Sequence, residues 1–359
     1  MNSGHFATYL NLAFGAAAVF TLLPVIYYLC TGWAVRREKL FCYMRDDQAL
    51  SIYYDQFPWS NTREADLAKR FRHQVSYLYG RRHFIAPLSL FTILSLGAFW
   101  GLCRSAQFNA HVLKGEFVIS KTAAAALLGA FLWCISDELA RIVRRDLSPK
   151  DVYGWGFRIL LSVPFGFAAA AVLTADVGVP VAFFLGAFPT QTLFTFARRI
   201  AVQKLAMGDQ QSDSGLELQQ LQSVSRGVAE TFQDNGIETI SALAWADPVD
   251  LTIRTNLDFN YVLDCMSQAL LWVYFEDKTR ILFRFSLRGS QEVLSLTNDL
   301  NGVLVPFDST QVLTPKQSQA KATLSNIAGI LNLTEAALLT TLLQSACDPY
   351  TTFINRVWR

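Results

Sequence analysis

Charged side chains are scarce in this sequence. Asp, Glu, Lys and Arg make up 17% of its 359 residues, hydrophobic residues make up 52%, and the mean hydropathy is +0.25. A typical soluble domain has about 25% charged residues, so this composition is too apolar for an ordinary soluble protein. The long uncharged runs all lie in the first two hundred residues, so the apolar material is concentrated in one part of the chain.

The sequence also lacks the short motifs that carry common enzymatic chemistry. It contains no Walker A phosphate loop and no GxGxxG, HExxH or GxSxG motif. Its four histidines do not fall at metal-ligand spacing, and its six cysteines form no CxxC pair. These absences favour a protein that is not an enzyme, and we expect it to use no metal ion and no cofactor.

Four apolar runs approach or exceed the ~20 residues that cross a bilayer as a helix. They cover residues 8–28, 84–103, 119–135 and 157–175. A fifth run, 177–196, contains Pro180 and Pro189, and we interpret it as a kinked span, with a re-entrant hairpin as the alternative. The sequence therefore predicts an all-α membrane bundle of about five spans, followed by an all-helical domain.

Basic residues predict the orientation of the spans, because Lys and Arg concentrate in cytoplasmic loops. The loops after the first, third and fifth spans are rich in them: Arg36, Arg37, Lys39, Lys69, Arg70, Arg72, Arg81, Arg82, Arg141, Arg144, Arg145, Lys150, Arg198, Arg199 and Lys204. The opposite loops hold little beyond Arg104 and Lys114. We expect an outside N-terminus and a cytoplasmic C-terminal domain, in a bacterial inner membrane.

The two parts of the chain carry opposite charge. Residues 1–204 contain 21 Lys and Arg against 12 Asp and Glu, a net of +9, and residues 205–359 contain 10 against 17, a net of −7. The polar stretch "MGDQQSDSGLE" marks the boundary between them. We therefore divide the chain into a transmembrane domain, 1–206, which includes a cytoplasmic segment at 34–83, and a cytoplasmic tandem helical-hairpin domain, 207–359.

Small residues recur at four-residue spacing in four of the predicted spans. Such pairs let helix backbones approach closely in lipid, where apolar side chains give helices little reason to associate. The pairs are Gly97 with Gly101, Ala125 with Gly129, Gly166 with Ala170, and Ala182 with Gly186. They predict tight helix packing, and we expect the protein to form homo-oligomers.

Ionisable residues are absent from the middle of the predicted spans. Asp137, Glu138, Arg141 and Arg158 lie at the inner ends of the third and fourth spans, where they predict an ionic cluster at the inner face. Transporters usually place polar groups in matched halves at mid-membrane, and this sequence shows no matched halves. These four residues are also the only candidates for a third possibility, an enzyme that acts on lipid.

The C-terminal part predicts short helices joined by tight turns. Asn235-Gly236 supplies one turn, Ile237 packs the next helix, and Asp247 caps a further helix that begins at Pro248. The spacing of Phe232, Gly236, Ile240 and Leu243 recurs in Phe285, Gly289, Val293 and Leu296, which predicts two helical hairpins about fifty residues apart. We expect Asn235, Gly236, Ile237, Trp245 and Gly289 to contact a partner.

The stretch "GIETISALAWADPVDL" resembles helix-hairpin-helix and SAM-like domains, and "FSLRGSQEVLSL" is similar. The spans resemble uncharacterised bacterial multi-pass inner-membrane proteins, in which "GAF" opens a span that ends before "RRDLSP" and "LGAFP" precedes "ARR". The first resemblance implies protein contact or self-association, or DNA binding through turn amides. Asp234, Glu238 and the net charge of −7 oppose binding to phosphates, so we expect no nucleic-acid partner.

These patterns support a non-enzymatic integral membrane protein that forms oligomers. Its acidic cytoplasmic helical domain would then serve for contact with a cytoplasmic protein or with other copies of the chain. The alternative is an oligomeric pore or membrane effector that the cytoplasmic domain gates, as in bacterial defence or stress responses. The predicted partners are the lipid bilayer, further copies and a cytoplasmic protein.

Overall fold

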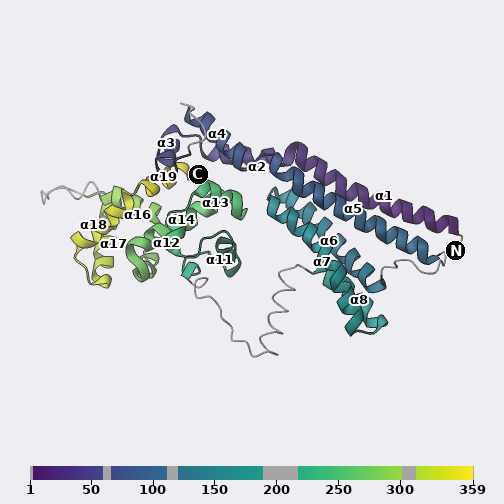
Figure 1. Ribbon diagram of the computed structural model, residues 1–359. Coiled ribbons are helices and arrows are strands. Elements are labelled where there is room, and N and C mark those ends of the chain that lie inside the picture. Colours follow the sequence, from purple (N-terminus) through teal and green to yellow (C-terminus); the bar gives the residue numbers. More distant parts are fainter. Residues whose placement is uncertain (1–2, 60–65, 111–119, 189–216, 301–312, 359) are drawn as a thin grey trace. The chain divides into compact units, whose positions relative to one another are not determined.

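The computed structural model describes residues 3–59, 66–110, 120–188, 217–300 and 313–358. Throughout these residues the secondary structure is helical, with no strand, which confirms the all-α prediction. The chain forms two compact units. The first comprises Met1–Arg37 and Tyr79–Gln210, and the second comprises Glu38–Leu78 and Gln211–Arg359 (Figure 1).

Long apolar helices build the first unit. They are α1 (Ser3–Tyr27), α5 (Arg82–Ala110), α6 (Lys121–Arg144), α7 (Pro149–Val172) and the shorter α8 (Ala175–Ala187). A π-helical turn, Tyr28–Gly32, follows α1 and leads into α2 (Trp33–Tyr43). α1 and α5 lie side by side, and α6 packs against α7 and α8 (Figure 1).

Among the described residues, four helices are long and apolar enough to cross a membrane, and they contain the first four predicted spans or most of each. The candidate spans are Asn11–Tyr43, Leu67–Cys103, Lys121–Arg144 and Pro149–Ala171. Large apolar side chains such as Leu23, Ile93 and Leu132 are exposed along them, although apolar side chains normally avoid water. This pattern fits helices whose outer faces contact lipid.

The fifth predicted span falls only partly within the described residues. The apolar helix α8 ends at Ala187, and Phe188 is extended with φ −75° and ψ 145°. An extended residue is expected before Pro189, because the proline ring disfavours a helical conformation at the preceding position. Residues 189–196 of the predicted span lie outside the described part of the chain.

A further pair of helices passes the same apolar test if it counts as one broken span. These helices are α17 (Pro315–Leu331) and α18 (Glu335–Ala346), and they meet at an angle of 108°. Their apolar side chains Leu324, Ile327 and Leu338 are buried in a core of the second unit. We therefore interpret them as core helices of that unit.

The second unit is built from short capped helices around a buried central one. Its members are α3 (Asp47–Gln56), α4 (Leu67–Leu78), α11 (Arg226–Gln233), α12 (Ile240–Ala244), α13 (Pro248–Thr255), α14 (Phe259–Phe275), α15 (Thr279–Phe283), α16 (Ser290–Leu300), α17, α18 and α19 (Pro349–Val357). Helix α14 is the central helix, because Val262, Met266 and Leu270 are fully buried in one core and Leu271 lies in a second.

Residues 38–78 belong to the second unit, whereas the sequence-based division placed residues 34–83 with the membrane part. Leu50, Tyr53 and Phe71 share one core with Phe232 and Met266. The physical reason is the aromatic composition of this segment, which buries its rings against α14 and α19 instead of leaving them in solvent. The C-terminal part therefore needs residues 38–78 to complete its core.

The internal repeat is present, but its predicted register is wrong by three residues. The turn after α11 and the turn after α15 have the same backbone hydrogen bonds, Ile237 N to Phe232 O at 3.0 Å and Leu287 N to Leu282 O at 3.2 Å. Gly236 therefore corresponds to Ser286, and both are left-handed, with φ 84° and 61°. The prediction aligned Gly236 with Gly289 because both are glycines. In the structure, Ser286 occupies the second left-handed position.

Candidate functional site

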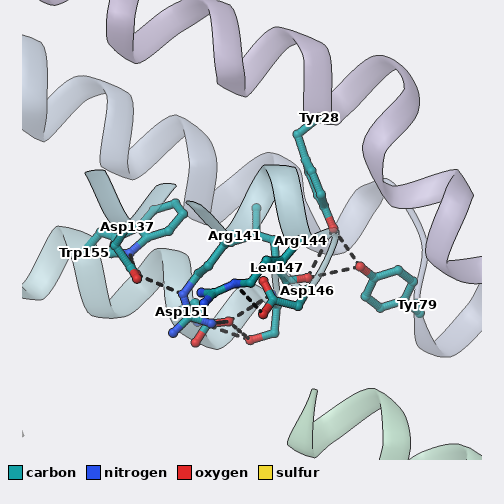
Figure 2. A network of polar contacts seen from close by, with 10 residues as sticks. Tyr28, Tyr79, Asp137, Arg141, Arg144, Asp146, Leu147, Asp151 and Trp155 are labelled. Carbon is teal, nitrogen blue, oxygen red and sulfur yellow. Dashed lines mark hydrogen bonds and ion pairs between the residues drawn. The ribbon is translucent and has the colours of Figure 1, made fainter. Parts of the chain in front are cut away.

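A network of polar contacts lies at the end of the first unit where α6 and α7 are joined (Figure 2). Arg141 of α6 forms ion pairs through Nε with Asp137 Oδ2 and through Nη1 with Asp151 Oδ2, each at 2.9 Å. Trp155 Nε1 of α7 donates to Asp137 Oδ2 at 2.8 Å. These contacts join the two helices, and all three charged partners are only partly exposed.

The chain enters α7 through a capping box, which the stretch "RRDLSPKD" predicts with Ser148 as the cap, Pro149 in the first turn and Asp151 completing the box. The Ser148 hydroxyl accepts from Asp151 N at 3.3 Å, and Asp151 Oδ2 accepts from Ser148 N at 3.0 Å. Pro149 occupies the first turn, where its missing N–H needs no partner. The cap fixes Asp151 beside Arg141, so one carboxylate both starts the helix and pairs with the neighbouring helix.

Two tyrosines join the same network from other segments. The hydroxyls of Tyr28 and Tyr79 lie 2.7 Å apart, and they donate to the carbonyl oxygen of Leu147 at 3.2 and 3.1 Å. Figure 2 shows both rings directed at the turn between α6 and α7. Tyr28 begins the π-helical turn after α1, and Tyr79 precedes α5, so the contact joins three segments that lie far apart in sequence.

The π-helical turn places Tyr28 in this contact. Gly32 lies one turn further on, and a Cβ atom at that position would overlap the Tyr28 ring. Single π-helical turns insert an extra residue into a helix and are frequent at functional sites. A glycine is therefore required here so that the Tyr28 ring can pack against the helix and reach Leu147.

The predicted helix-packing residues divide into two sets. Gly129, Gly166 and Gly186 lie against the backbone of a neighbouring helix, so closely that a Cβ atom at any of them would overlap backbone atoms. Ala182 is buried and Ala125 packs against the same cluster.

The other set does not pack against the described part of the chain. A Cβ atom added at Gly97 or Gly101 of α5 would meet no described atom within 4 Å, and Ala170 is exposed.

The structure brings two of the four predicted ionic residues together. Asp137 pairs with Arg141. Arg158 instead donates through Nε to the carbonyl oxygen of Gly186 at 3.0 Å, and its guanidinium lies 4.4 Å from the centre of the Trp133 ring. Glu138 is fully buried, and neither of its carboxylate oxygens has a hydrogen-bond partner in the described part of the chain.

The predicted partner-binding residues have different surroundings in the second unit. Gly236 is exposed at its turn, and Asn235 Nδ2 donates to Thr231 O at 2.8 Å. Trp245 is 45% exposed and packs edge-on against Tyr350, with ring centres 5.2 Å apart.

Two of these residues pack inside the unit. Ile237 packs against its core. Gly289 touches Ser267 of α14, where a Cβ atom would overlap the serine hydroxyl.

A buried polar network in the second unit was not predicted. Tyr53 donates to both carboxylate oxygens of Asp247, at 3.1 and 3.0 Å, and accepts from Gln74 Nε2 at 3.0 Å. Desolvation raises the pKa of Asp247 to about 6 and raises that of Tyr53 well above its ordinary value. This network joins α3 and α4 to the cap of α13.

Most residues of the two polar networks could not be identified from the sequence. The helix caps marked Asp151 and Asp247, but the aromatic residues Tyr28, Tyr79, Trp155 and Tyr53 belong to no motif in the sequence. Their partners lie between 18 and 194 residues away, and a single sequence does not show such distant contacts.

The described residues contain no group of three or more His, Cys, Asp or Glu side chains that could hold a metal ion. Comparisons with known protein families, with curated proteins and with solved structures find no match for this chain.

Proposed function

We propose that this chain is a non-enzymatic integral membrane protein that forms homo-oligomers through α5 and presents its second unit to the cytoplasm for protein contact. The open face at Gly97 and Gly101 supports this proposal most directly. A Cβ atom at Gly129, Gly166 or Gly186 would overlap neighbouring backbone, whereas a Cβ atom at Gly97 or Gly101 would meet no described atom within 4 Å. Paired small residues on a lipid-facing helix favour close packing between copies.

The second unit is formed by two separate stretches of the chain, which supports the same orientation for both stretches. Residues 38–78 and 211–359 share one core, so both must lie on the same side of the membrane. The chain then crosses an even number of times between them. Helices α5, α6 and α7 would supply three crossings, and a fourth crossing that includes α8 would complete the even number. The positive charge of the connecting loops favours the cytoplasmic side.

Protein contact is the proposed role of the second unit for two reasons. Trp245 exposes an aromatic ring on its surface, and exposed aromatic residues are enriched at protein interfaces. The C-terminal part also carries a net charge of −7, which favours a basic protein partner over nucleic acid.

Replacing both Gly97 and Gly101 by leucine is expected to reduce the oligomer to a monomer, because the larger side chains keep the backbones apart. The native mass in mild detergent measures this. Gly15→Leu is the matched control, since Gly15 in α1 is also exposed with no described atom within 4 Å. We expect this control to keep the wild-type mass. If the double variant also kept the wild-type mass, α5 would not be the interface.

A gated pore is the second function that we propose, and the tyrosine contact favours it. Tyr28 precedes the point after Arg37 at which the chain enters the second unit, and Tyr79 is the first residue after the chain returns to the first unit. A movement of the second unit could therefore act on α1 and α5 together. A closed ring of four or more copies in the native-mass measurement would favour the pore, and a dimer would favour the contact module.

A further inference from the structure

Glu138 of α6 is buried and has no hydrogen-bond partner among the described residues, in contrast to the acidic residue beside it. Its side chain has 0% exposure, and neither Oε1 nor Oε2 has a hydrogen-bond donor among the described residues. Asp137 accepts from Trp155 and pairs with Arg141. An isolated ionised carboxylate in an apolar interior is very costly, so Glu138 needs a bound cation to neutralise it.

Three of the four helices that pack against α6 have long stretches without an ionisable side chain. Helix α6 contacts α1, α5, α7 and α8. Residues 10–26, 84–102 and 177–187 of α1, α5 and α8 contain no ionisable residue. Tyr28 follows α1, and its hydroxyl donates to Leu147.

The remaining ionisable groups belong to α7 and to α6 itself. On α7, Arg158 binds Gly186 O and lies over Trp133, Asp151 pairs with Arg141, and Lys150 and Tyr153 are exposed. On α6, Cys134 directs its sulfur toward Trp155 O at 3.7 Å, and Arg141 pairs with two aspartates. None of these contacts involves Glu138.

A proton fits Glu138 better than a metal cation does. Sodium, calcium and magnesium ions need several oxygen ligands, whereas the Glu138 oxygens have no polar neighbour at hydrogen-bond distance in the described residues. One carboxyl oxygen alone can hold a proton. We propose that Glu138 is a proton-binding site of the membrane bundle, protonated while α6 is packed and ionised only when water reaches it.

This site would couple pH to helix packing. Loss of the proton leaves a charge between α6 and its neighbours, and the charge is stabilised only if the helices separate enough to admit water or a donor. The site does not depend on oligomerisation, so a monomer and an oligomer would show it alike.

Infrared spectroscopy of the full-length protein in liposomes tests the proposal. The wild type is expected to show the carbonyl band of a protonated carboxylic acid at neutral pH, and to lose it in alkaline buffer. Glu138→Gln should lack this band at neutral pH. Asp146→Asn is the control, because Asp146 is a partly exposed carboxylate of the same unit, paired with Arg144 at 3.2 Å. This control should keep the band. A neutral-pH spectrum that Glu138→Gln leaves unchanged would overturn the proposal.

A second measurement needs no variant. Dicyclohexylcarbodiimide reacts with protonated carboxyl groups in apolar surroundings, and mass spectrometry locates the modified residue. We expect modification at Glu138 and not at Asp137, decreasing as the pH rises. Modification that sodium ions block while pH has no effect would show a bound metal cation, and would also overturn the proposal.

Discussion

Gly186→Leu is expected to disrupt the membrane bundle more than a substitution at any of its exposed glycines. A Cβ atom added to Gly186 of α8 would lie within 3.0 Å of backbone atoms of Ala126 and Ala130 in α6, and Gly129 of α6 lies against α8 in the same way. Overpacking a core costs about 1–3 kcal/mol when side chains can move aside. Backbone atoms cannot move aside, so we expect a loss of about 3 kcal/mol or more.

Thermal unfolding in detergent, followed by size-exclusion chromatography, measures this effect. The control is Gly154→Leu, since Gly154 in α7 has no described atom within 4 Å. We expect this control to unfold like the wild type, while Gly186→Leu aggregates or unfolds at a clearly lower temperature. Equal unfolding temperatures for the two variants would show that α6 and α8 are not in close contact.

The second unit is expected to lose stability as the pH rises from about 4 to about 6, through Asp247. Its pKa is about 6 in the folded state because desolvation disfavours the charged form, whereas its ordinary value is 3.8. A raised folded-state pKa contributes stability below the unfolded pKa, and this contribution is lost as the pH rises through the folded value. The loss amounts to roughly 2 kcal/mol, allowing for partial exposure.

Asp247→Asn separates this effect from the other carboxylates. Asparagine also caps helices well and can accept from Tyr53, but it does not titrate. The stability difference between this variant and the wild type should therefore shift by about 2 kcal/mol in favour of the variant from pH 4 to pH 7. Hydrogen exchange of the α13 amides in the full-length protein, corrected for intrinsic rates, measures it. A difference that is constant with pH would contradict the assigned role of Asp247.

The fold class and the helix starts could be predicted because they depend on local sequence. Uncharged runs of membrane length predict apolar helices wherever they occur, and four were confirmed. The capping box of Ser148 and the Asp247-Pro248 cap were also confirmed, because a cap involves residues only two or three positions apart.

The packing of the glycines could not be predicted from spacing alone. The pair Gly97 and Gly101 and the pair Ala182 and Gly186 have the same spacing, yet the first is open and the second lies within the bundle. Which face of a helix meets a neighbour depends on its rotation and on the other helices. The small-residue pattern therefore indicates that close packing is possible, but not with which partner.

The sequence-based division left residues 38–78 out of the second unit for a related reason. The sequence showed that residues 38–57 were aromatic-rich, but not that Tyr53 would contact Asp247, 194 residues away. The repeat register failed because glycine is not the only residue that adopts left-handed backbone, as Ser286 with φ 61° shows. Both errors concern contacts or conformations that a local pattern does not determine.

The central claim is that residues 38–78 and the C-terminal part form one unit on one side of a membrane that the chain crosses. Cys42 and Cys347 are both exposed and belong to these two parts, whereas Cys103 lies near the far end of α5. Single-cysteine variants can be labelled with a membrane-impermeant maleimide in intact spheroplasts and in inside-out vesicles. The account predicts that Cys42 and Cys347 are labelled from the same side, the cytoplasmic one, and Cys103 from the other. Labelling of Cys42 and Cys347 from opposite sides would contradict it.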